Sequence, residues 1–280
     1  MTDVWFITGA STGLGRTLAE TVLAHGDRVI ATARNVAALD DLTGPDPDPD
    51  RVIRLPLDVT DPQQVRAAVA EAIERAGAID VLVNNAGHGL VGALEELADE
   101  QFARVMGTNV FGVFAVTRAV LPHMRARRRG HIVQLSSVGG MVANPGHAAY
   151  ATAKFAVEGL SEALAGEVAP FGIRVTIVEP GPFRTGFAGR SMNFAEPIDD
   201  YRATPAGALR ARFSAQDGVQ PNDPVRAAEA IITAVRDSSS PLRLPLGPEA
   251  VSRIRQKLRS QLADLEAWEK VSLDTRFPDS

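Results

Sequence analysis

The chain has 280 residues and no cysteine, and 29 basic against 34 acidic side chains give it a formal charge of −5. The missing cysteines exclude disulfides, thiolate metal sites and cysteine nucleophiles, and the mild acidity argues against nucleic acid or anionic lipid as the main partner. The first apolar run is too short for a signal peptide, and no apolar run approaches the roughly 18 residues of a membrane span. We therefore expect a cytoplasmic protein that binds no membrane.

Most of the chain alternates short apolar segments with longer segments of helical period. The expected strands are 4–7, 28–32, 52–55, 80–83, 132–135 and 173–178, and the expected helices are 14–25, 65–76, 99–124 and 148–168. Strands that are apolar on both faces and alternate with helices predict a parallel sheet covered by helices on each side. Right-handed crossovers then favour a doubly wound sheet, a Rossmann-type α/β fold in a single domain over residues 1–280.

Three segments depart from this alternation. Residues 44–50 alternate proline with aspartate and predict a solvated surface loop. Residues 186–224 are irregular with scattered aromatic side chains, which favours a lid over a substrate rather than a merely packed excursion. Residues 249–270 predict an amphipathic helix. Its apolar side carries Val251, Ile254, Leu258, Leu262 and Leu265.

Glycines crowd the turn between the first strand and the first helix. The spacing is G-x-x-x-G-x-G, and a threonine precedes it. Glycine is needed where a backbone turns tightly and approaches a pyrophosphate, whose charge then lies at a helix N-terminus. Because the loop follows a strand and opens a helix, a dinucleotide site is favoured over a plain tight turn. Its candidate cofactor-binding residues are Gly9, Ser11, Thr12, Gly13, Leu14 and Gly15.

This loop and three later motifs together resemble the short-chain dehydrogenase/reductase family, in its typical-length branch. The later motifs are Asp58-Val59, which the family places at the adenine ring, Asn84-Asn85-Ala86-Gly87 after the fourth strand, and Pro180-Gly181 with Thr185 after the sixth. The extended C-terminal helix is similar to that of hydroxysteroid-dehydrogenase-like members. The resemblance implies a nicotinamide cofactor and a dimer or tetramer. It adds as cofactor-binding residues Asp58, Val59, Asn85, Ala86, Gly87, Tyr150, Lys154, Pro180, Gly181, Phe183 and Thr185.

The end of the second strand selects between NAD and NADP. A carboxylate there accepts hydrogen bonds from the ribose 2′-hydroxyl, whereas an arginine accommodates a 2′-phosphate. This chain has Ala33 where NAD-preferring family members carry an acid, and Arg34 follows it. A guanidinium binds phosphate in bidentate fashion, so we predict NADP(H) with Arg34 as the main selector. The alternative is that Arg34 is an ordinary solvated residue.

Lysine and tyrosine are rare in this chain, which has three lysines and two tyrosines. Tyr150 and Lys154 nonetheless stand four residues apart, so they are neighbours on one helix face. Ser137 precedes Tyr150 by thirteen residues and follows a strand end, where ligands bind in open α/β sheets. The family spacing prefers Ser137 to the neighbouring Ser136. The family also gives Asn109 a role in a water-linked proton path to the lysine, although alone it could equally be a core amide.

These residue types suit carbonyl reduction. Hydride transfer to a carbonyl leaves an alkoxide that needs a proton, and a phenol with a pKa of about 10 donates one poorly. A nearby ammonium favours the phenolate and can lower that pKa by about one to three units. Tyr150 can then act as acid and base near neutral pH while Ser137 orients the substrate oxygen.

We therefore predict an NADP(H)-dependent oxidoreductase that interconverts a carbonyl and a secondary alcohol. The apolar residues of 186–224 suggest a bulky hydrophobic substrate. A non-catalytic NADP-binding sensor is one alternative, and a lyase on the same scaffold is another, although the intact glycine loop and Lys154 argue against the lyase. The histidines show no metal-ligand spacing. His88 and His147 lie on loops near the inferred pocket; we interpret them as surface loop residues, and contact with the substrate is the alternative. Tyr201, which has no lysine partner, is expected to be a packing or lid residue.

Overall fold

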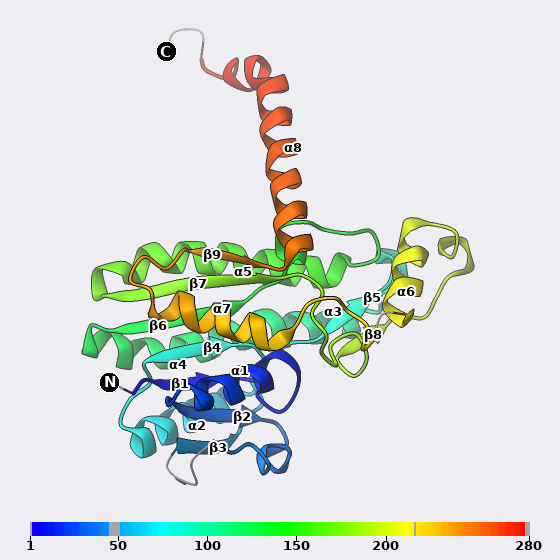
Figure 1. Cartoon of the computed structure of the whole chain (residues 1–280). Helices are drawn as coiled ribbons and strands as arrows, with labels where there is room; N and C mark the ends of the chain where they lie inside the picture. Colours follow the sequence, from blue (N-terminus) through cyan, green and yellow to red (C-terminus); the bar gives the residue numbers. More distant parts are fainter. Residues whose placement is uncertain (1, 45–50, 216, 278–280) are drawn as a thin grey trace.

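A parallel sheet of seven strands forms the centre of the protein (Figure 1). The structure is a computed structural model that describes residues 2–44, 51–215 and 217–277, so the loop expected at 44–50 lies outside the described residues except for its first glycine. The strand order is β3-β2-β1-β4-β6-β7-β9. From β1 the chain first adds β2 and β3 on one side, and then crosses to the other side of β1 to add β4, β6, β7 and β9. The strands are β1 Val4–Ile7, β2 Arg28–Ala33, β3 Val52–Pro56, β4 Val81–Asn84, β6 Gly130–Leu135, β7 Ile173–Pro180 and β9 Arg243–Leu246.

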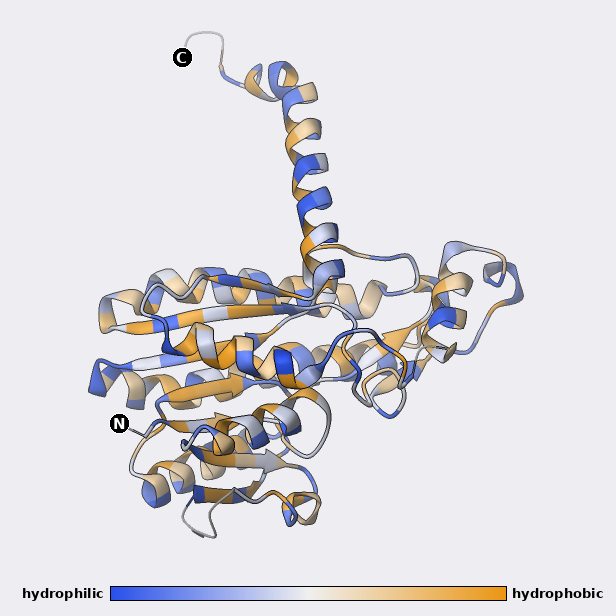
Figure 2. Ribbon diagram, viewed as in Figure 1, coloured by the Kyte–Doolittle hydropathy of each residue, from blue (hydrophilic) through white to orange (hydrophobic). Residues whose placement is uncertain are grey.

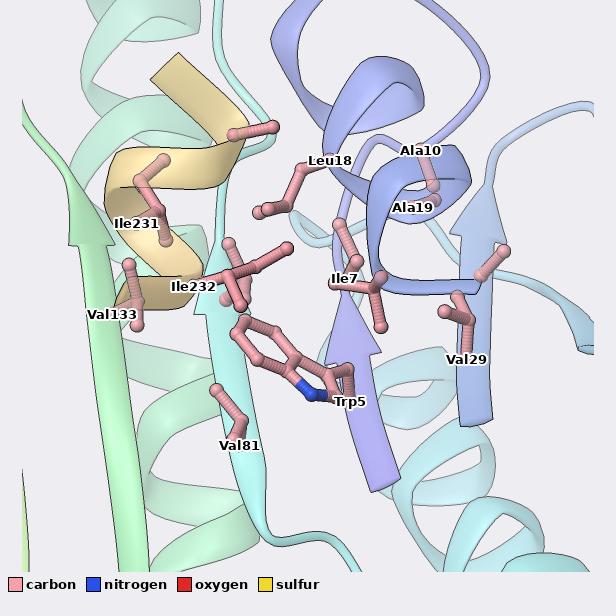
Figure 3. Packing of buried hydrophobic residues seen from close by; sticks show 14 of the residues in the cluster. Trp5, Ile7, Ala10, Leu18, Ala19, Val29, Val81, Val133, Ile231 and Ile232 are labelled. Carbon is pink, nitrogen blue, oxygen red and sulfur yellow. The ribbon is translucent and has the colours of Figure 1, made fainter. Parts of the chain in front are cut away.

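Helices cover both faces of the sheet. The main helices are α1 Gly13–Ala24, α2 Pro62–Ala76, α3 Asp99–Met106, α4 Val113–Arg127, α5 Ala148–Val168, α6 Pro205–Ala215, α7 Pro224–Arg236 and α8 Pro248–Leu273. Trp5 and Ile7 point toward α1 and α7 and pack in one apolar cluster (Figure 3), whereas Val4 and Phe6 pack with α2, α4 and α5 on the opposite face. A strand buried on both faces cannot alternate apolar with polar residues, which explains the continuous apolar runs. The predicted doubly wound α/β fold is confirmed.

The helix expected at 99–124 extends to Arg127 and is not regular throughout. A π-helical segment, Gly107–Gly112, joins α3 to α4 without a break. Within the described residues this continuous helix, Asp99–Arg127, also has the length and composition that a membrane span would need, which a search for one unbroken apolar run does not detect. Its α4 part packs on the sheet through Val116 and Val120, as the core helix of a globular domain does.

Five of the strands and helices were not predicted, namely β5, β8, β9, α6 and α7. The edge strand β9 has only four residues and contains Pro245, and proline weakens any strand pattern. A two-stranded parallel sheet pairs β5, Gly89–Val91, with β8, Met192–Phe194, about a hundred residues later in the chain. The segment expected to be irregular therefore contains β8 and α6. These elements depend on contacts between distant parts of the chain, which local periodicity does not report.

The C-terminal helix α8 begins one residue earlier and ends three residues later than expected. Only its first two turns are anchored, where Ala250 and Ile254 are buried. The rest projects away from the body of the protein, with hydrophobic and hydrophilic residues mixed along it (Figures 1 and 2). Beyond Ile254, the apolar side that the sequence predicts is therefore not packed on the described part of this chain.

Candidate active site

The loop between β1 and α1 is shaped by glycines at positions where a side chain does not fit. Gly9 and Gly13 have φ values of +65° and +60°, in the left-handed region that favours glycine. A Cβ on Gly15 would lie 2.2 Å from Nδ2 of Asn85 and 2.7 Å from the carbonyl oxygen of Gly9. Thr12 precedes α1 and does not cap it with its side chain. The first N–H groups of α1 are thus available to an anion such as a pyrophosphate.

Asn85 fastens this loop to the end of β4. Its side-chain nitrogen donates hydrogen bonds to the carbonyl oxygens of Thr8 (2.9 Å) and Gly9 (3.0 Å). The hydroxyl of Thr8 accepts hydrogen bonds in return from the backbone N–H groups of Asn85 (2.9 Å) and Ala86 (3.0 Å). The two strand ends at which the chain order reverses are therefore held together, and ligands bind in this crevice in open α/β folds.

The loop after β7 closes the other side of the crevice. The N–H of Gly181 donates to the carbonyl oxygen of Leu246 (2.9 Å), which fixes the start of the loop beside β9. Thr185 returns to the glycine loop, since a Cβ on Gly13 would lie 3.8 Å from its Cβ. Phe183 packs against the core together with Leu14. Residues from the first and second halves of the chain therefore meet at one crevice.

The residues predicted at the adenosine side lie near the ends of β2 and β3. Arg34 directly follows β2, is exposed, and has no hydrogen-bond or ion-pair partner in the described ranges. Asp58 turns its carboxylate toward its own loop and accepts hydrogen bonds from the N–H (2.9 Å) and hydroxyl (2.7 Å) of Thr60. Val59 is buried against Gly112, where a Cβ would come within 2.6 Å of its Cγ2. Within the part of the chain that the structure describes, no carboxylate pairs with the Arg34 guanidinium.

Tyr150, Lys154 and Ser137 come together at the start of α5. Ser137 follows β6, and a Cβ on Gly139 would lie 3.4 Å from its Oγ and 3.2 Å from Cε1 of the Tyr150 ring, so the hydroxyl lies beside the tyrosine. The Nζ atom of Lys154 lies 5.7 Å from the centre of the Tyr150 ring and donates a 2.6 Å hydrogen bond to the carbonyl oxygen of Leu135. Tyr150 and Lys154 are both buried, with 7% and 6% of their surfaces exposed. Ser137 rather than Ser136 therefore reaches the tyrosine, and both partners are held out of water.

Burial opposes ionisation of both groups. It raises the pKa of the Tyr150 phenol to about 12, although the hydrogen bond with Ser137 acts in the opposite direction. It lowers the pKa of Lys154 to about 8, and the Glu158 carboxylate opposes that shift. A protonated phenol and an ammonium are thus the forms near neutral pH. This is the pair that can give a proton to an alkoxide.

Asn109 lies in the π-helical segment and is completely buried. Its side-chain nitrogen donates to the carbonyl oxygen of His88 (2.8 Å), and its side-chain oxygen accepts from the His88 N–H (3.0 Å). A Cβ on Gly87 would lie 3.1 Å from the same oxygen. Asn109 therefore positions the loop that follows β4. Single π turns of this kind are frequent at functional sites.

His147 was interpreted as a surface loop residue, and this is wrong. Only 6% of its surface is exposed, and its ring centre lies 5.3 Å from that of Tyr150 and 4.9 Å from that of Phe213. Burial lowers its pKa to about 4, and its Nε2 has no hydrogen-bond partner in the described ranges. Phe187 also approaches Tyr150, with ring centres 5.8 Å apart. The i,i+3 spacing to Tyr150 was the available signal in the sequence.

Glu158 is a second residue that sequence reasoning missed, although it follows Lys154 by one helical turn. It is buried and accepts a 3.1 Å hydrogen bond from Arg243, which also lies 3.6 Å from the carboxylate of Glu179. Burial raises the pKa of both carboxyls, and that of Glu179 reaches about 7. Of these groups it is Glu158 that supports the positive charge of Lys154.

Replacing Glu158 by Gln is expected to move the alkaline limit of activity to lower pH. Without the carboxylate the pKa of Lys154 falls below about 8, so the ammonium is lost earlier as pH rises. We expect kcat to change by less than about twofold at pH 6 and to fall several-fold at pH 8. Glu162→Gln is the control, because Glu162 also pairs with Arg243 but is exposed. Equal pH profiles for the two variants would contradict the role of Glu158.

Fold and site together define a dinucleotide-binding oxidoreductase. A family model described as short chain dehydrogenase matches residues 3–194. The chain is 41% identical to the oxidoreductase BOA17 of Botryotinia fuckeliana over 98% of this chain and 99% of that protein. It is 39% identical to the 3-ketodihydrosphingosine reductase of Bacteroides thetaiotaomicron over 94% of both chains. The chain belongs to the short-chain dehydrogenase family.

Solved structures agree with this assignment. A short-chain dehydrogenase from Streptomyces avermitilis superposes with a TM-score of 0.91 at 45% identity over 99% of both chains. A short-chain dehydrogenase/reductase from Burkholderia phymatum in complex with NAD has a TM-score of 0.79 at 26% identity, over 95% of both chains. One from Burkholderia cenocepacia in complex with NADP has a TM-score of 0.73 at 28% identity, over 95% of this chain and 96% of that one. Proteins of this fold thus bind either nicotinamide dinucleotide.

Proposed function

We propose that the protein is a cytoplasmic, NADP(H)-dependent oxidoreductase that interconverts a carbonyl and a secondary alcohol. The observation that carries the proposal is that Ser137 lies beside the buried pair Tyr150 and Lys154 at the carboxyl edge of the sheet. A protein that only senses the dinucleotide has no use for a phenol buried beside an ammonium. The loop fits the cofactor, because Gly9 and Gly13 take left-handed φ values that let the backbone turn tightly and Thr12 leaves the first N–H groups of α1 uncapped.

Each residue has one task in the proposed reaction. NADPH, when bound, supplies the hydride. The Ser137 hydroxyl donates a hydrogen bond to the substrate carbonyl oxygen and holds it beside the Tyr150 phenol. Tyr150 gives its proton to that oxygen as negative charge develops there, and the Lys154 ammonium stabilises the phenolate that remains. Asn109 keeps the loop after β4 in place through its two hydrogen bonds to the backbone of His88.

Arg34 supports NADP over NAD. Its guanidinium follows β2 at the position where a 2′-phosphate is recognised in this fold, and it has no partner in the described residues. A cation without a carboxylate is suited to bidentate binding of a phosphate.

The surroundings of Tyr150 support a hydrophobic substrate. His147 and Phe187 contact its ring, and Phe213 extends the aromatic cluster through His147. His147 is neutral at physiological pH because burial lowers its pKa to about 4. The similarity to a 3-ketodihydrosphingosine reductase also supports a ketone as the oxidised substrate. An apolar wall beside the proton donor favours bulky apolar carbonyl compounds.

The test is NADPH oxidation measured against a panel of carbonyl compounds that vary in size and polarity. We expect turnover with large apolar ketones at kcat/KM values at least about tenfold above those for small polar ones, since each buried methylene contributes about 0.8 kcal/mol. If small polar carbonyls are the better substrates, the hydrophobic assignment is wrong. If NADPH binds but no member of the panel is reduced, the sensor alternative replaces the enzyme.

A further inference from the structure

The projecting part of α8, which stands clear of the body in Figure 1, exposes large apolar side chains that no described part of the chain covers. The helix is fixed at its base, where Glu249 accepts a 3.0 Å hydrogen bond from Asn222 and Arg253 donates a 2.7 Å hydrogen bond to Asn144. Beyond this base the large apolar side chains are at least half exposed. They include Leu258 (50%), Leu262 (54%), Leu265 (61%), Trp268 (65%) and Leu273 (64%).

The spacing of these residues makes a continuous stripe. Steps of four, three and three residues from Leu258 through Leu262 and Leu265 to Trp268 keep the side chains on one side of the helix. Monomeric proteins rarely expose an apolar strip of this extent unless it binds a partner. A helix with no tertiary contact is also marginal in water, so a partner would stabilise its outer turns.

The charged side chains of α8 from Arg253 to Lys270 fall into a basic half and an acidic half. The first half carries Arg253, Arg255, Lys257 and Arg259, and the second half carries Asp264, Glu266 and Glu269, with Lys270 as the exception. From Arg255 to Lys270, none of these charged side chains has an ion-pair partner among the residues that the structure describes. The boundary between the halves falls at Gln261 and Leu262, in the middle of the leucine stripe.

We propose that α8 pairs with α8 of a second copy of this chain, in antiparallel orientation. A two-fold axis near Gln261 and Leu262 places the basic half of each helix beside the acidic half of the other. It also brings Leu258 opposite the partner's Leu265, so that the leucines meet at the centre. A two-fold interface must be self-complementary, and this distribution of charge has that property. Parallel pairing would instead place like charges side by side.

The same charges argue against an anionic membrane as the occupant. A helix that lies on such a surface carries cations along its whole polar side. Here the outer half, which projects furthest from the body, carries three carboxylates within six residues. An anionic surface would repel that half, whereas a second copy of the helix neutralises it.

Cysteine cross-linking tests the orientation directly, because the natural chain contains no cysteine. The variants Arg255→Cys and Glu269→Cys are made as chains of different length, so that the mass of each disulfide-linked pair shows which variants it contains. The two variants are mixed before oxidation. Antiparallel pairing predicts disulfides between the two variants at least tenfold more abundant than those within either. Disulfides that join Arg255→Cys to itself would show parallel pairing, and no disulfide would show that the helices do not meet. Either result would overturn the proposal.

The subunit count provides a second measurement. The double variant Leu262→Asp, Leu265→Asp is expected to have half the mass of the natural protein by light scattering. Its circular dichroism spectrum should show that the body of the protein is still folded. Reversing the acidic half by Asp264→Lys and Glu266→Lys should weaken association at least tenfold, and adding Lys257→Glu and Arg259→Glu should restore it. An unchanged mass in the leucine variant would refute the interface. A natural protein that is monomeric but sediments with phosphatidylserine vesicles would refute it in favour of a membrane.

Discussion

Replacing Tyr150 by Phe is expected to lower kcat for carbonyl reduction by about 10²- to 10⁴-fold. The substitution removes only the hydroxyl, so the buried ring keeps its contacts with His147 and Phe187. No other phenol is close enough to give the proton, because Tyr201 is the only other tyrosine in the chain. The measurement is steady-state turnover of NADPH with the best ketone of the panel. Cofactor binding, followed by nicotinamide fluorescence, should stay within about twofold, since the lost group acts on the transition state.

Tyr201→Phe is the matched control for this loss. The Tyr201 hydroxyl donates a 2.8 Å hydrogen bond to Glu95 at the surface and has no lysine at the following helical turn. Its removal should therefore leave kcat within about twofold, as expected for an exposed hydrogen bond. Turnover that survives in Tyr150→Phe at the level of this control would remove Tyr150 as the acid.

Replacing Arg34 by Asp is expected to change the preference for NADPH over NADH by at least about 10²-fold. Charge-assisted hydrogen bonds to a phosphate contribute about 1.5–3 kcal/mol, and a carboxylate at the same place repels the phosphate instead. The variant should lose kcat/KM for NADPH and gain it for NADH, because an acid after β2 can accept hydrogen bonds from the ribose 2′-hydroxyl. The measurement is kcat/KM for both cofactors at a saturating concentration of ketone.

Arg125→Asp makes the same change of net charge near the amino end of β6, away from the carboxyl ends of the strands where the site lies. Arg125 is exposed in the last turn of α4, just before β6 begins. A general effect of charge on cofactor attraction would lower kcat/KM for both dinucleotides in this control, so its cofactor ratio should stay constant. If Arg34→Asp leaves the ratio equally constant, Arg34 is a solvated side chain and the selector lies elsewhere.

The residues that could be predicted from the sequence depend on local spacing. Tyr150 and Lys154 need only one helical turn to meet, and the glycines of the β1–α1 loop need only a strand before them and a helix after them. The burial of β1 on both faces can also be predicted from local sequence, because its residues are all apolar. These features give the doubly wound sheet and the main residues of the site without any knowledge of distant contacts.

What could not be predicted depends on segments far apart in the chain. His147 is buried partly by Phe213 of α6, which follows it by more than sixty residues, so the spacing of His147 to Tyr150 is the one local signal and does not by itself predict burial. The strand β5 exists only because β8 returns beside it. For α8 the sequence does predict the apolar side, but the same pattern fits a helix packed on its own domain and one that waits for a partner.

The π turn at Asn109 determines how the buried face of the continuous helix runs from α3 into α4. One line of buried positions runs from Val105 through Asn109, Val113, Thr117 and Val120 to Met124, in steps of four, four, four, three and four residues, and Gly112 and Val116 are buried beside it. These positions complete five turns in nineteen residues. Five turns of a regular α-helix, at about 3.6 residues each, need about eighteen, so this helix contains about one extra residue. A regular α-helix of nineteen residues would instead turn about 100° past five full turns, so the π turn absorbs the extra residue and keeps the buried face of α4 in line with that of α3. A family member that lacks this extra residue therefore completes the same five turns as a regular helix and packs α4 with the same set of side chains.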